Sequence, residues 1–277
     1  MDIKSKLKEQ DFKFKHSLGQ NFITDTNLLE AIVSDARVES KDNVLGIGVG
    51  AGTLTKQICQ KAKKVVGVEI DKSLEPIIND NLKDNKNFEL KLGDILKYRP
   101  DEIKDFFDGQ RFKVVANLPY YISTPIIFYL IENDFNLESL TIMLQLEVAE
   151  RLAGKIGTKD YGAITVLLNA IGDVSITRKV SKTMFVPQPK VDSAVVRFDV
   201  NKNKYDVDFK NLSTVVKASF AMRRKTLCNN IMKGFSLSRE VVETMLENLG
   251  IDITIRAENL GTQQFVALCG EIVKLKS

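Results

Sequence analysis

The run Asn117-Leu118-Pro119-Tyr120 places side chains with a distinct chemical capability directly after an apolar segment. Methylation of an exocyclic amine is difficult because the nitrogen lone pair is delocalised into the ring. Two acceptors must therefore hold the N–H groups and aim the lone pair at the methyl donor. Asn117 supplies one acceptor with its side-chain carbonyl. Leu118 supplies the other with its backbone carbonyl, since Pro119 favours an extended residue before it and lacks an N–H of its own.

Tyr120 completes this motif with a flat face on which a base stacks, a contact worth about 1–3 kcal/mol. No general base is needed before the transfer, because positioning sets the rate. The motif therefore predicts methylation of an amino group. The alternative is that the motif is a rigid proline turn without a catalytic role. This alternative is less favoured because the motif follows a predicted strand and a set of cofactor-binding signals.

Glycines and acids at the ends of three upstream predicted strands indicate a nucleotide-like cofactor. Gly48 and Gly50 follow the first of these strands and let the backbone turn sharply against a ligand. Glu69 ends the second strand, where acids accept hydrogen bonds from ribose hydroxyls. Asp94 follows the third strand, where a carboxylate can accept from an adenine amino group. Thr53 stands where a dinucleotide-binding motif has glycine, so the set favours S-adenosylmethionine over NAD.

A second contact for the base is predicted in the proline-rich run Phe185-Val186-Pro187-Gln188-Pro189. The two prolines hold the loop extended and present Phe185 to the other face of an extruded adenine. The alternative is that Phe185 is a core side chain beneath the loop. Both alternatives stand at this point.

The elements that must position these residues alternate between short apolar runs and helical patterns. Strands are predicted at residues 43–47, 64–69, 88–92, 112–116, 140–144, 164–171 and 192–198. Helices are predicted at residues 25–38, 52–61 and 72–84 and, after a polar linker, at 208–221, 224–232, 238–249 and 262–274. This pattern predicts an α/β fold, with a seven-stranded sheet in residues 1–200 and an all-helical domain at residues 201–277.

The composition excludes several classes of function. With 44% hydrophobic and 27% charged residues among 277, the chain has the content of a folded protein. It has three scattered cysteines and one histidine, His16, which argues against a disulfide framework, a metal site and Ser-His-Asp chemistry. No apolar run approaches the ~18 residues that span a bilayer, and no secretory signal is visible. We therefore expect a cytoplasmic protein without a membrane partner, and a monomer by default.

Positive charge is clustered, although the formal net charge is only +4. Five basic and no acidic side chains occur at residues 217–233, namely Lys217, Arg223, Arg224, Lys225 and Lys233. The N-terminal arm, up to Lys15, carries five lysines against three acids. Such clusters are typical of surfaces that bind RNA phosphates, and a merely solvated face is the alternative.

A series of ordered motifs resembles the KsgA (RsmA) family of small-subunit rRNA adenine N6,N6-dimethyltransferases over nearly the whole chain. The motifs are residues 16–22 (HSLGQNF), the glycine turn at 46–52, 67–71 (GVEID), 93–94 (GD), 117–124 (NLPYYIST), 147–152 (EVAERL), 185–195 (FVPQPKVDSAV) and 220–227 (FAMRRKTL), followed by Asn229 and Asn230. The resemblance implies a Rossmann-like methyltransferase domain followed by a small helical domain. It also implies two methyl transfers to each of two adjacent adenosines in the 3′-terminal hairpin of 16S rRNA, within an immature ribosomal subunit, as a step of ribosome biogenesis.

The resemblance also assigns roles to individual residues. It implies S-adenosylmethionine contacts at Asn21, Ile23, Gly48 with the adjoining Gly50, Glu69, Asp94 and Asn117. It implies adenine contacts at Asn117, Leu118, Pro119, Tyr120 and Phe185. It implies RNA-phosphate contacts at Arg223, Arg224 and Lys225.

Two positions of the glycine turn depart from this family's usual pattern, Glu-Ile-Gly-Pro-Gly. Gly46 stands in place of the glutamate, and Val49 stands in place of the proline. The first change removes a carboxylate that holds the cofactor's methionine end or orders the loop. The second frees the turn and adds a β-branched side chain beside the ligand. We predict weakened cofactor affinity and an unaltered fold. Leu146 also replaces a lysine, which costs one RNA contact.

Two alternative functions follow from the same residues. The Erm class, which methylates one adenine of large-subunit rRNA and confers antibiotic resistance, shares the glycine, Gln-Asn-Phe and Asn-x-Pro-Tyr motifs. Residues 147–152 and 223–230 resemble KsgA more closely. The second alternative is an RNA-binding assembly factor that keeps the scaffold with weakened catalysis, and the altered glycine turn is its only support.

Overall fold

A computed structural model describes residues 15, 19–133 and 135–275 of the chain. Apart from Lys15, the predicted basic N-terminal arm and His16 lie outside these residues. The chain divides into two compact units. The first contains residues up to 149 together with 175–199, and the second contains 150–174 together with 200–277. Each unit is described by itself.

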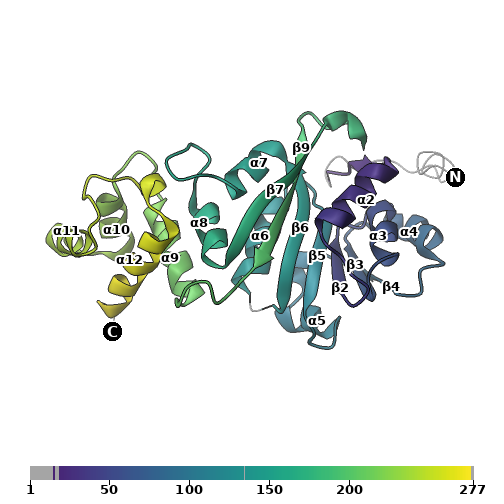
Figure 1. Cartoon of the computed structure of the whole chain (residues 1–277), viewed down its shortest axis with the longest axis horizontal. Coiled ribbons are helices and arrows are strands. Elements are labelled where there is room, and N and C mark those ends of the chain that lie inside the picture. The colour runs from purple at the N-terminus through teal and green to yellow at the C-terminus, as the bar shows by residue number, and fades with distance from the viewer. Residues whose placement is uncertain (1–14, 16–18, 134, 276–277) are drawn as a thin grey trace. The chain divides into compact units, whose positions relative to one another are not determined.

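A seven-stranded sheet forms the centre of the first unit, with the strand order β4-β3-β2-β5-β6-β9-β7 (Figure 1). Its strands are β2 (Asn43–Ile47), β3 (Lys64–Glu69), β4 (Phe88–Leu92), β5 (Phe112–Asn117), β6 (Leu137–Gln145), β7 (Gly172–Val180) and β9 (Ser193–Val200). Strands β4, β3, β2, β5 and β6 run parallel, and β9 pairs antiparallel with β6. Two short strands, β1 (Phe22–Ile23) and β8 (Phe185–Val186), pair separately. The predicted Rossmann-like α/β architecture is therefore confirmed.

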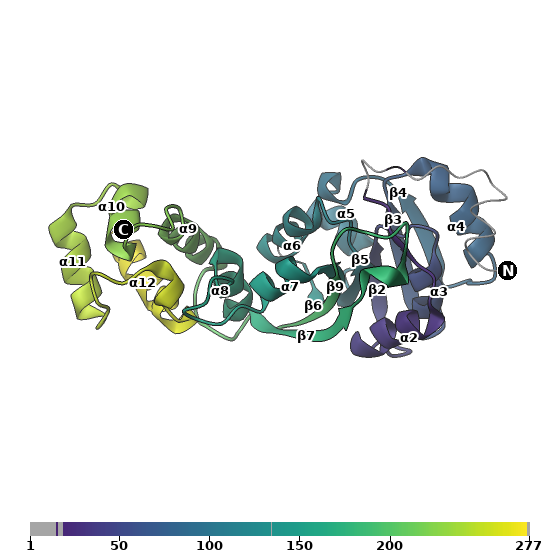
Figure 2. The same cartoon turned by 90° about the horizontal axis from the view of Figure 1, so that it is seen from above.

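Helices cover both faces of this sheet. Figure 2 shows α2 and α3 on one face and α5 and α6 on the other. The helices that accompany the sheet are α2 (Thr26–Asp35), α3 (Thr53–Cys59), α4 (Glu75–Leu82), α5 (Pro100–Asp105), α6 (Ser123–Glu132) and α7 (Leu146–Leu152). Asp25, the first residue of the helix predicted at 25–38, is the N-cap of α2. Its side chain accepts a hydrogen bond from the Leu28 backbone N–H at 2.7 Å, which satisfies an amide that the helix itself leaves unpaired.

One predicted strand is wrong. Residues 164–171 form most of a helix, α8 (Ala163–Ala170), and the next segment forms strand β7 instead. A short run that is apolar throughout does not distinguish a strand from a buried helix by its periodicity. In β7 both terminal residues are buried and exposed residues alternate with partly buried ones between them, which is the period of two that a strand facing solvent on one side requires. The sheet has the predicted number of seven strands, although one of the predicted strands is a helix.

The second unit is helical. It contains α8, α9 (Phe209–Ser219), α10 (Leu227–Phe235), α11 (Arg239–Asn248) and α12 (Thr262–Lys274). The rings of Phe220 and Phe265 stack in its core with 5.7 Å between their centroids. The predicted domain boundary near residue 200 assigned residues 150–174 to the sheet domain, whereas their contacts group them with these helices. The difference arises because α8 is a helix that packs against α9 and α12.

In the part of the chain that the structure describes, no helix is long and apolar enough to cross a membrane. The same residues contain no group of three side chains that is suited to hold a metal ion. All three cysteines are buried and unpaired, and burial raises the pKa of the Cys59 thiol to about 12. A thiol held protonated in this way is not a nucleophile at neutral pH.

Candidate active site

Three segments line an open cavity at the carboxyl ends of β2, β3 and β5, whose space is about 820 Å³ with open solvent included. We call them the strap (residues 19–23), the glycine turn (46–52) and the acceptor loop (117–120). The carboxyl edge is where open parallel sheets bind ligands, because the loops there diverge. Residues far apart in the sequence thereby form one site, which we call the donor cavity.

Two glycines let these segments approach each other closely. Gly48 has φ +67°, and a Cβ atom there would lie 3.4 Å from Cδ of Pro119 in the acceptor loop. Gly50 has φ +59°, and a Cβ atom there would lie 2.8 Å from the Phe22 ring of the strap. Both backbone conformations favour glycine, and the second position has no room for a side chain. The glycine turn is therefore packed against both other segments.

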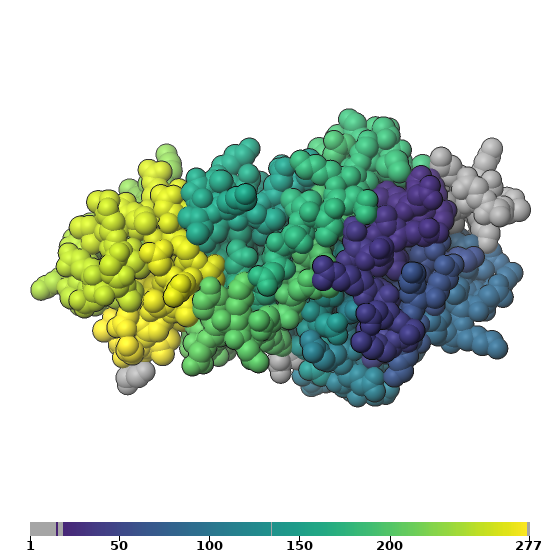
Figure 3. Space-filling model, in the orientation of Figure 1, coloured from purple at the N-terminus to yellow at the C-terminus, as the bar shows by residue number. Residues whose placement is uncertain are grey.

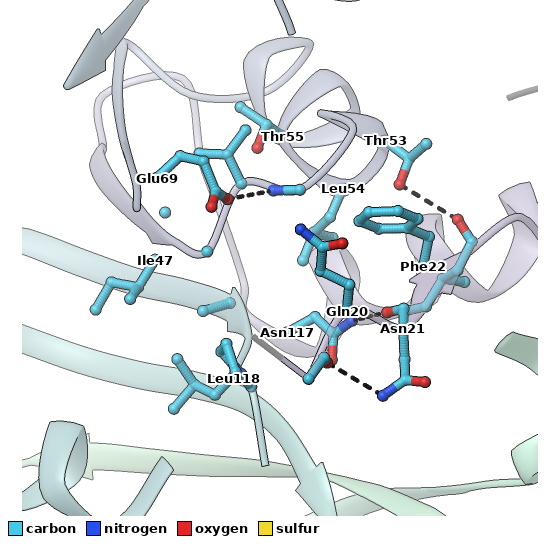
Figure 4. Close-up of a pocket in the computed structure, with 18 of the residues that line it drawn as sticks. Gln20, Asn21, Phe22, Ile47, Thr53, Leu54, Thr55, Glu69, Asn117 and Leu118 are labelled. Carbon is cyan, nitrogen blue, oxygen red and sulfur yellow. Dashed lines mark hydrogen bonds between the residues drawn. The ribbon is translucent and has the colours of Figure 1, made fainter. Parts of the chain in front are cut away.

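Glu69 lies at the end of β3, beside the glycine turn (Figure 4). Its carboxylate accepts hydrogen bonds from the backbone N–H of Gly50 at 2.8 Å and from that of Asp71 at 2.9 Å. Burial raises the pKa of this carboxyl, and the two backbone N–H groups oppose the shift only in part. A buried carboxylate that faces a cavity is suited to hold a polyhydroxylated ligand, because each carboxylate oxygen accepts more than one hydrogen bond.

A second, smaller cavity adjoins the donor cavity and shares Ile47, Gly48, Ile70 and Pro119 with it. Its wall contains Asp94, whose carboxylate accepts from the Leu96 backbone N–H at 3.0 Å.

The remaining wall of the smaller cavity is apolar. Ile95 lies in it, with Ile70 and Tyr121 at 44% and 54% exposure. Apolar walls beside a carboxylate fit a flat heteroaromatic ring that carries an amino group. Sequence reasoning missed these three residues. For Ile70 and Ile95 the available signal was an isoleucine directly after each strand-end acid.

The amide of Asn117 is oriented by the strap. Its Nδ2 donates to the Asn21 backbone carbonyl at 3.0 Å (Figure 4). Because the nitrogen is committed to the strap, the side-chain oxygen is the atom left to accept from a substrate amine. The carbonyl of the strap accepts and cannot donate, so this hydrogen bond decides which of the two amide atoms turns toward the cavity.

Tyr120 is anchored at its far end. Its hydroxyl shares a 2.6 Å hydrogen bond with the Ser193 hydroxyl, and burial raises the pKa of the phenol. With the hydroxyl tied down, the ring lines the donor cavity as a neutral, fixed surface. Leu118 is buried, and its backbone N–H donates to the Met143 carbonyl at 3.1 Å, which seats the loop on β6.

Phe185 does not line either cavity. It is 2% exposed, pairs with Ile23 between the short strands β8 and β1, and belongs to the core on the α2 face of the sheet. The structure therefore favours the alternative in which Phe185 is a core side chain. The physical reason is the β1–β8 pair, which draws the proline-rich loop against the strap. Ile23 is also buried, and its carbonyl accepts from the Thr53 hydroxyl.

A cluster that sequence reasoning missed fixes the start of the strap. Asp71 is buried, and its carboxylate accepts from Lys15 Nζ at 2.6 Å and from Gln20 Nε2 at 2.7 Å. The Lys15 backbone N–H donates to Gln20 Oε1 at 2.8 Å, which closes the cluster. We call this set the clasp. The Asp71 backbone N–H also donates a hydrogen bond to Glu69, so the clasp links the strap to this carboxylate of the donor cavity.

The Asp71 carboxyl titrates below its ordinary range. Burial alone would raise its pKa, but hydrogen bonds from Lys15, Ser73 and Gln20 outweigh burial and lower it. A carboxyl with a lowered folded-state pKa adds stability above its ordinary pKa, and this stability is lost as pH falls through the lowered value.

We expect Asp71→Asn to lower the free energy of unfolding by about 1–3 kcal/mol, because it leaves Lys15 without a counter-charge. The difference from the parent protein should stay constant from about pH 8 to about pH 5 and shrink only below the ordinary range of an aspartate. Denaturant titrations across that range measure it. A difference that shrinks above pH 5 would contradict the lowered pKa.

Gly46 and Val49, the two departures in the glycine turn, differ in their surroundings. A Cβ atom at Gly46 would lie 3.9 Å from its nearest neighbours, which include the Thr55 hydroxyl, so there is room for the first atom of a side chain. Val49 is 8% exposed, and a Cβ atom at Gly67 would lie only 2.5 Å from its Cγ2. Val49 is thus accommodated by the glycine beneath it and packs into the core. It also lines the donor cavity, as Gly46 does, so both departures bear on the cofactor site.

Arg223, Arg224 and Lys225 lie in the second unit, in an exposed turn between α9 and α10 that we call the cationic turn. They were predicted at a helix start, but α10 begins at Leu227 with Thr226 as its N-cap. Thr226 accepts from the Asn229 backbone N–H, which is the bond that starts the helix.

Comparisons with known proteins agree with this geometry. The family model for "Ribosomal RNA adenine dimethylase" matches residues 11–274. A "Ribosomal RNA small subunit methyltransferase A" from Clostridium acetobutylicum is 45% identical and covers 97% of each chain. The protein of that name from Clostridioides difficile is 42% identical over 96% of this chain and 93% of its own.

Two solved structures share the fold. A dimethyladenosine transferase from Plasmodium falciparum has a TM-score of 0.78 at 26% identity, covering 91% of this chain and 98% of its own. The 23S rRNA methyltransferase ErmE has a TM-score of 0.71 and covers 91% of this chain and 99% of its own. At 24% identity, the second likeness shows the fold alone.

Proposed function

This chain belongs to the ribosomal RNA adenine dimethylase family, and on that basis we propose that it transfers methyl groups from S-adenosylmethionine to N6 of two adjacent adenosines in the 3′-terminal hairpin of small-subunit rRNA. The protein is a methyltransferase with a Rossmann-like domain. When bound, S-adenosylmethionine supplies an electrophilic methyl group on its sulfonium. The chain's own residues bind and orient both reactants.

The observation that carries this proposal is the commitment of Asn117 Nδ2 to the strap. It leaves Oδ1 to accept from the adenine amine, with the Leu118 carbonyl proposed as the second acceptor and Tyr120 as the stacking face. Pro119 contributes by stiffening this loop. Two acceptors on one amine orient its lone pair, and that orientation, without a general base, is what speeds the transfer.

The cofactor residues support the same assignment. We propose that Glu69 binds the ribose and Asp94 the adenine amine, and that Asn21, Ile23, Gly48 and Gly50 shape the methionine end. The apolar walls beside Asp94 and the buried acid beside the glycine turn fit an adenosine moiety. Arg223, Arg224 and Lys225 are proposed to contact rRNA phosphates.

The finer setting of the reaction is also a proposal. The substrate is the RNA within an immature small subunit, because the RNA of a mature subunit would already carry the modification. The protein acts as a monomer in the cytoplasm, where ribosomes are assembled.

Gly46→Glu is expected to tighten S-adenosylmethionine binding by about tenfold, because a charge-assisted contact contributes about 1.5–3 kcal/mol before the cost of burying the carboxylate. Gly46→Gln is the matched control, since its side chain has nearly the size and shape of glutamate without the negative charge. Calorimetric titration of S-adenosylmethionine into the three proteins measures the effect. Equal affinities would show that the missing carboxylate does not limit the cofactor site.

Incubation with unmodified small subunits, unmodified large subunits and labelled S-adenosylmethionine tests the function. We expect label in small-subunit rRNA alone. Label in large subunits would favour an Erm-type activity, and binding without any transfer would favour an assembly factor. Either result would contradict the proposal.

A further inference from the structure

Two segments of the second unit present exposed cations beside each other. One is the cationic turn. The other is residues 154–160, which we call the lysine loop and which carries the exposed Lys155 and Lys159. The Arg223 guanidinium donates to the Lys159 backbone carbonyl at 3.0 Å. The two segments therefore touch, although they are more than sixty residues apart in the sequence.

The lysine loop is held in place from three sides. A Cβ atom at Gly154 would lie 2.8 Å from the backbone of Asp160, so the ends of the loop meet. The Gly157 N–H donates to the Glu258 carbonyl at 2.9 Å. The Tyr161 hydroxyl donates to a backbone carbonyl before α12 at 2.8 Å. Figure 3 shows this teal segment against the yellow C-terminal residues. These contacts fix the backbone from which the two lysine side chains extend.

The cationic turn is fixed by a buried amide. Asn230 is 2% exposed, and its Oδ1 accepts from the Met222 N–H at 3.1 Å. Its Nδ2 donates to the Ser219 carbonyl at 2.7 Å and to the Met222 carbonyl at 3.2 Å. A buried side chain that satisfies three backbone groups fixes the turn between α9 and α10. The cations that follow Met222 therefore start from a rigid base.

Among the described residues, no ion pair joins any of these five cations to a carboxylate. Asp160 is the one acid within the two segments, so their combined charge is strongly positive. Ile156, at 54% exposure, lies between the two lysines. Unpaired cations on a fixed backbone beside an exposed apolar side chain match a polyanion that also offers base and sugar carbon atoms for apolar contact, which describes RNA better than a single small anion.

We propose that the lysine loop and the cationic turn form one surface that contacts the rRNA backbone. Lys155 and Lys159 contact phosphates, and Arg223 joins the two segments while it keeps further N–H donors for the RNA. This inference rests on the proposed function. It adds to it the lysine loop, which the motifs of the sequence did not single out, and a positioning role for Arg223.

The test is the salt dependence of binding between the full-length protein and purified, unmodified small subunits. Lys155→Gln/Lys159→Gln should weaken binding by about tenfold near physiological salt. The slope of log affinity against log salt should become less steep by about 1–2, since about that many phosphate contacts are lost. The matched control is Lys61→Gln/Lys86→Gln. It makes the same charge change at exposed positions that precede β3 and β4, at the opposite edge of the sheet from the donor cavity.

Adding Arg223→Ala to the two lysine substitutions tests whether the lysine loop and the cationic turn bind RNA as one surface. The fold-change of the triple variant should fall short of the product of the separate fold-changes, because Arg223 acts partly through the loop. Full multiplication would show two independent contacts and overturn the joint surface. Affinity for S-adenosylmethionine should match the parent protein in all variants, and the unfolding midpoint should match it in the lysine variant and the control variant.

Three outcomes separate the two proposals. If the parent protein binds and methylates small subunits but the lysine variant keeps its affinity and slope, this inference is wrong and the proposed function stands. The same holds if the control variant loses as much affinity as the lysine variant. If the parent protein does not bind small subunits, the proposed function fails and the surface fails with it.

Discussion

Asn117→Ala is expected to reduce the rate of methyl transfer by about 10²–10³-fold, as removal of one preorganised hydrogen-bonding group at a reacting centre does in other enzymes. The substitution removes the proposed acceptor for the adenine amine and the hydrogen bond to the Asn21 carbonyl. The amine is then free to rotate, and its lone pair is no longer aimed at the methyl group. Single-turnover transfer to small-subunit rRNA at saturating cofactor measures this step without product release.

Two controls make the Asn117 result specific. Asn136→Ala is the same substitution at an exposed position before β6, on the opposite edge of the sheet, and should leave the rate unchanged. Binding of S-adenosylmethionine to Asn117→Ala should change far less than the rate, because the donor cavity keeps Glu69 and the glycine turn. A rate within a few-fold of the parent protein would refute the role of Asn117.

Glu69→Gln is expected to weaken S-adenosylmethionine binding by about 10–100-fold, since charge-assisted hydrogen bonds contribute about 1.5–3 kcal/mol each. The substitution removes the negative charge. It also places an amide nitrogen, which cannot accept, opposite one of the two backbone N–H groups that donate to the carboxylate in the parent protein, that of Gly50 or that of Asp71. Calorimetric titration measures the affinity. An unchanged affinity would place the ribose elsewhere.

The affinity of the parent protein for S-adenosylmethionine should also depend on pH. Burial raises the pKa of Glu69, so the carboxylate is protonated at a higher pH than an ordinary glutamate. The ionised form is the acceptor, so affinity falls as pH is lowered, beginning above the ordinary range. A raised folded-state pKa means that protonation of this group stabilises the fold, so local unfolding does not explain the loss. Glu69→Gln should show no such dependence over the same range.

The positions of the strands that carry the site, and the edge at which they end, could be predicted because each signal was local. Each cofactor signal is contained in a few consecutive residues. The signals are an acid after a strand, at Glu69 and Asp94, and the glycines between β2 and α3. The helix N-caps Asp25 and Ser238 were predictable for the same reason, since capping is a contact across three residues.

The remaining features depend on tertiary contacts that no local pattern carries. The clasp joins Lys15 to Asp71 across 56 positions, and neither residue is unusual in its own segment. The sequence left two roles for Phe185, base stacking and core packing. Only the pairing of β8 with β1 decides in favour of the core. Helix α8 was mistaken for a strand because an apolar run shows burial without showing its period.

The identity and position of the methylated nucleotide test the proposed reaction most directly. Unmodified small subunits are incubated with the parent protein and labelled S-adenosylmethionine, and the rRNA is then digested and mapped, with Asn117→Ala in parallel. We expect N6,N6-dimethyladenosine at two adjacent positions of the 3′-terminal hairpin, and almost none with the variant. Label at any other site, or equal label from the Asn117→Ala protein, would contradict the proposed reaction.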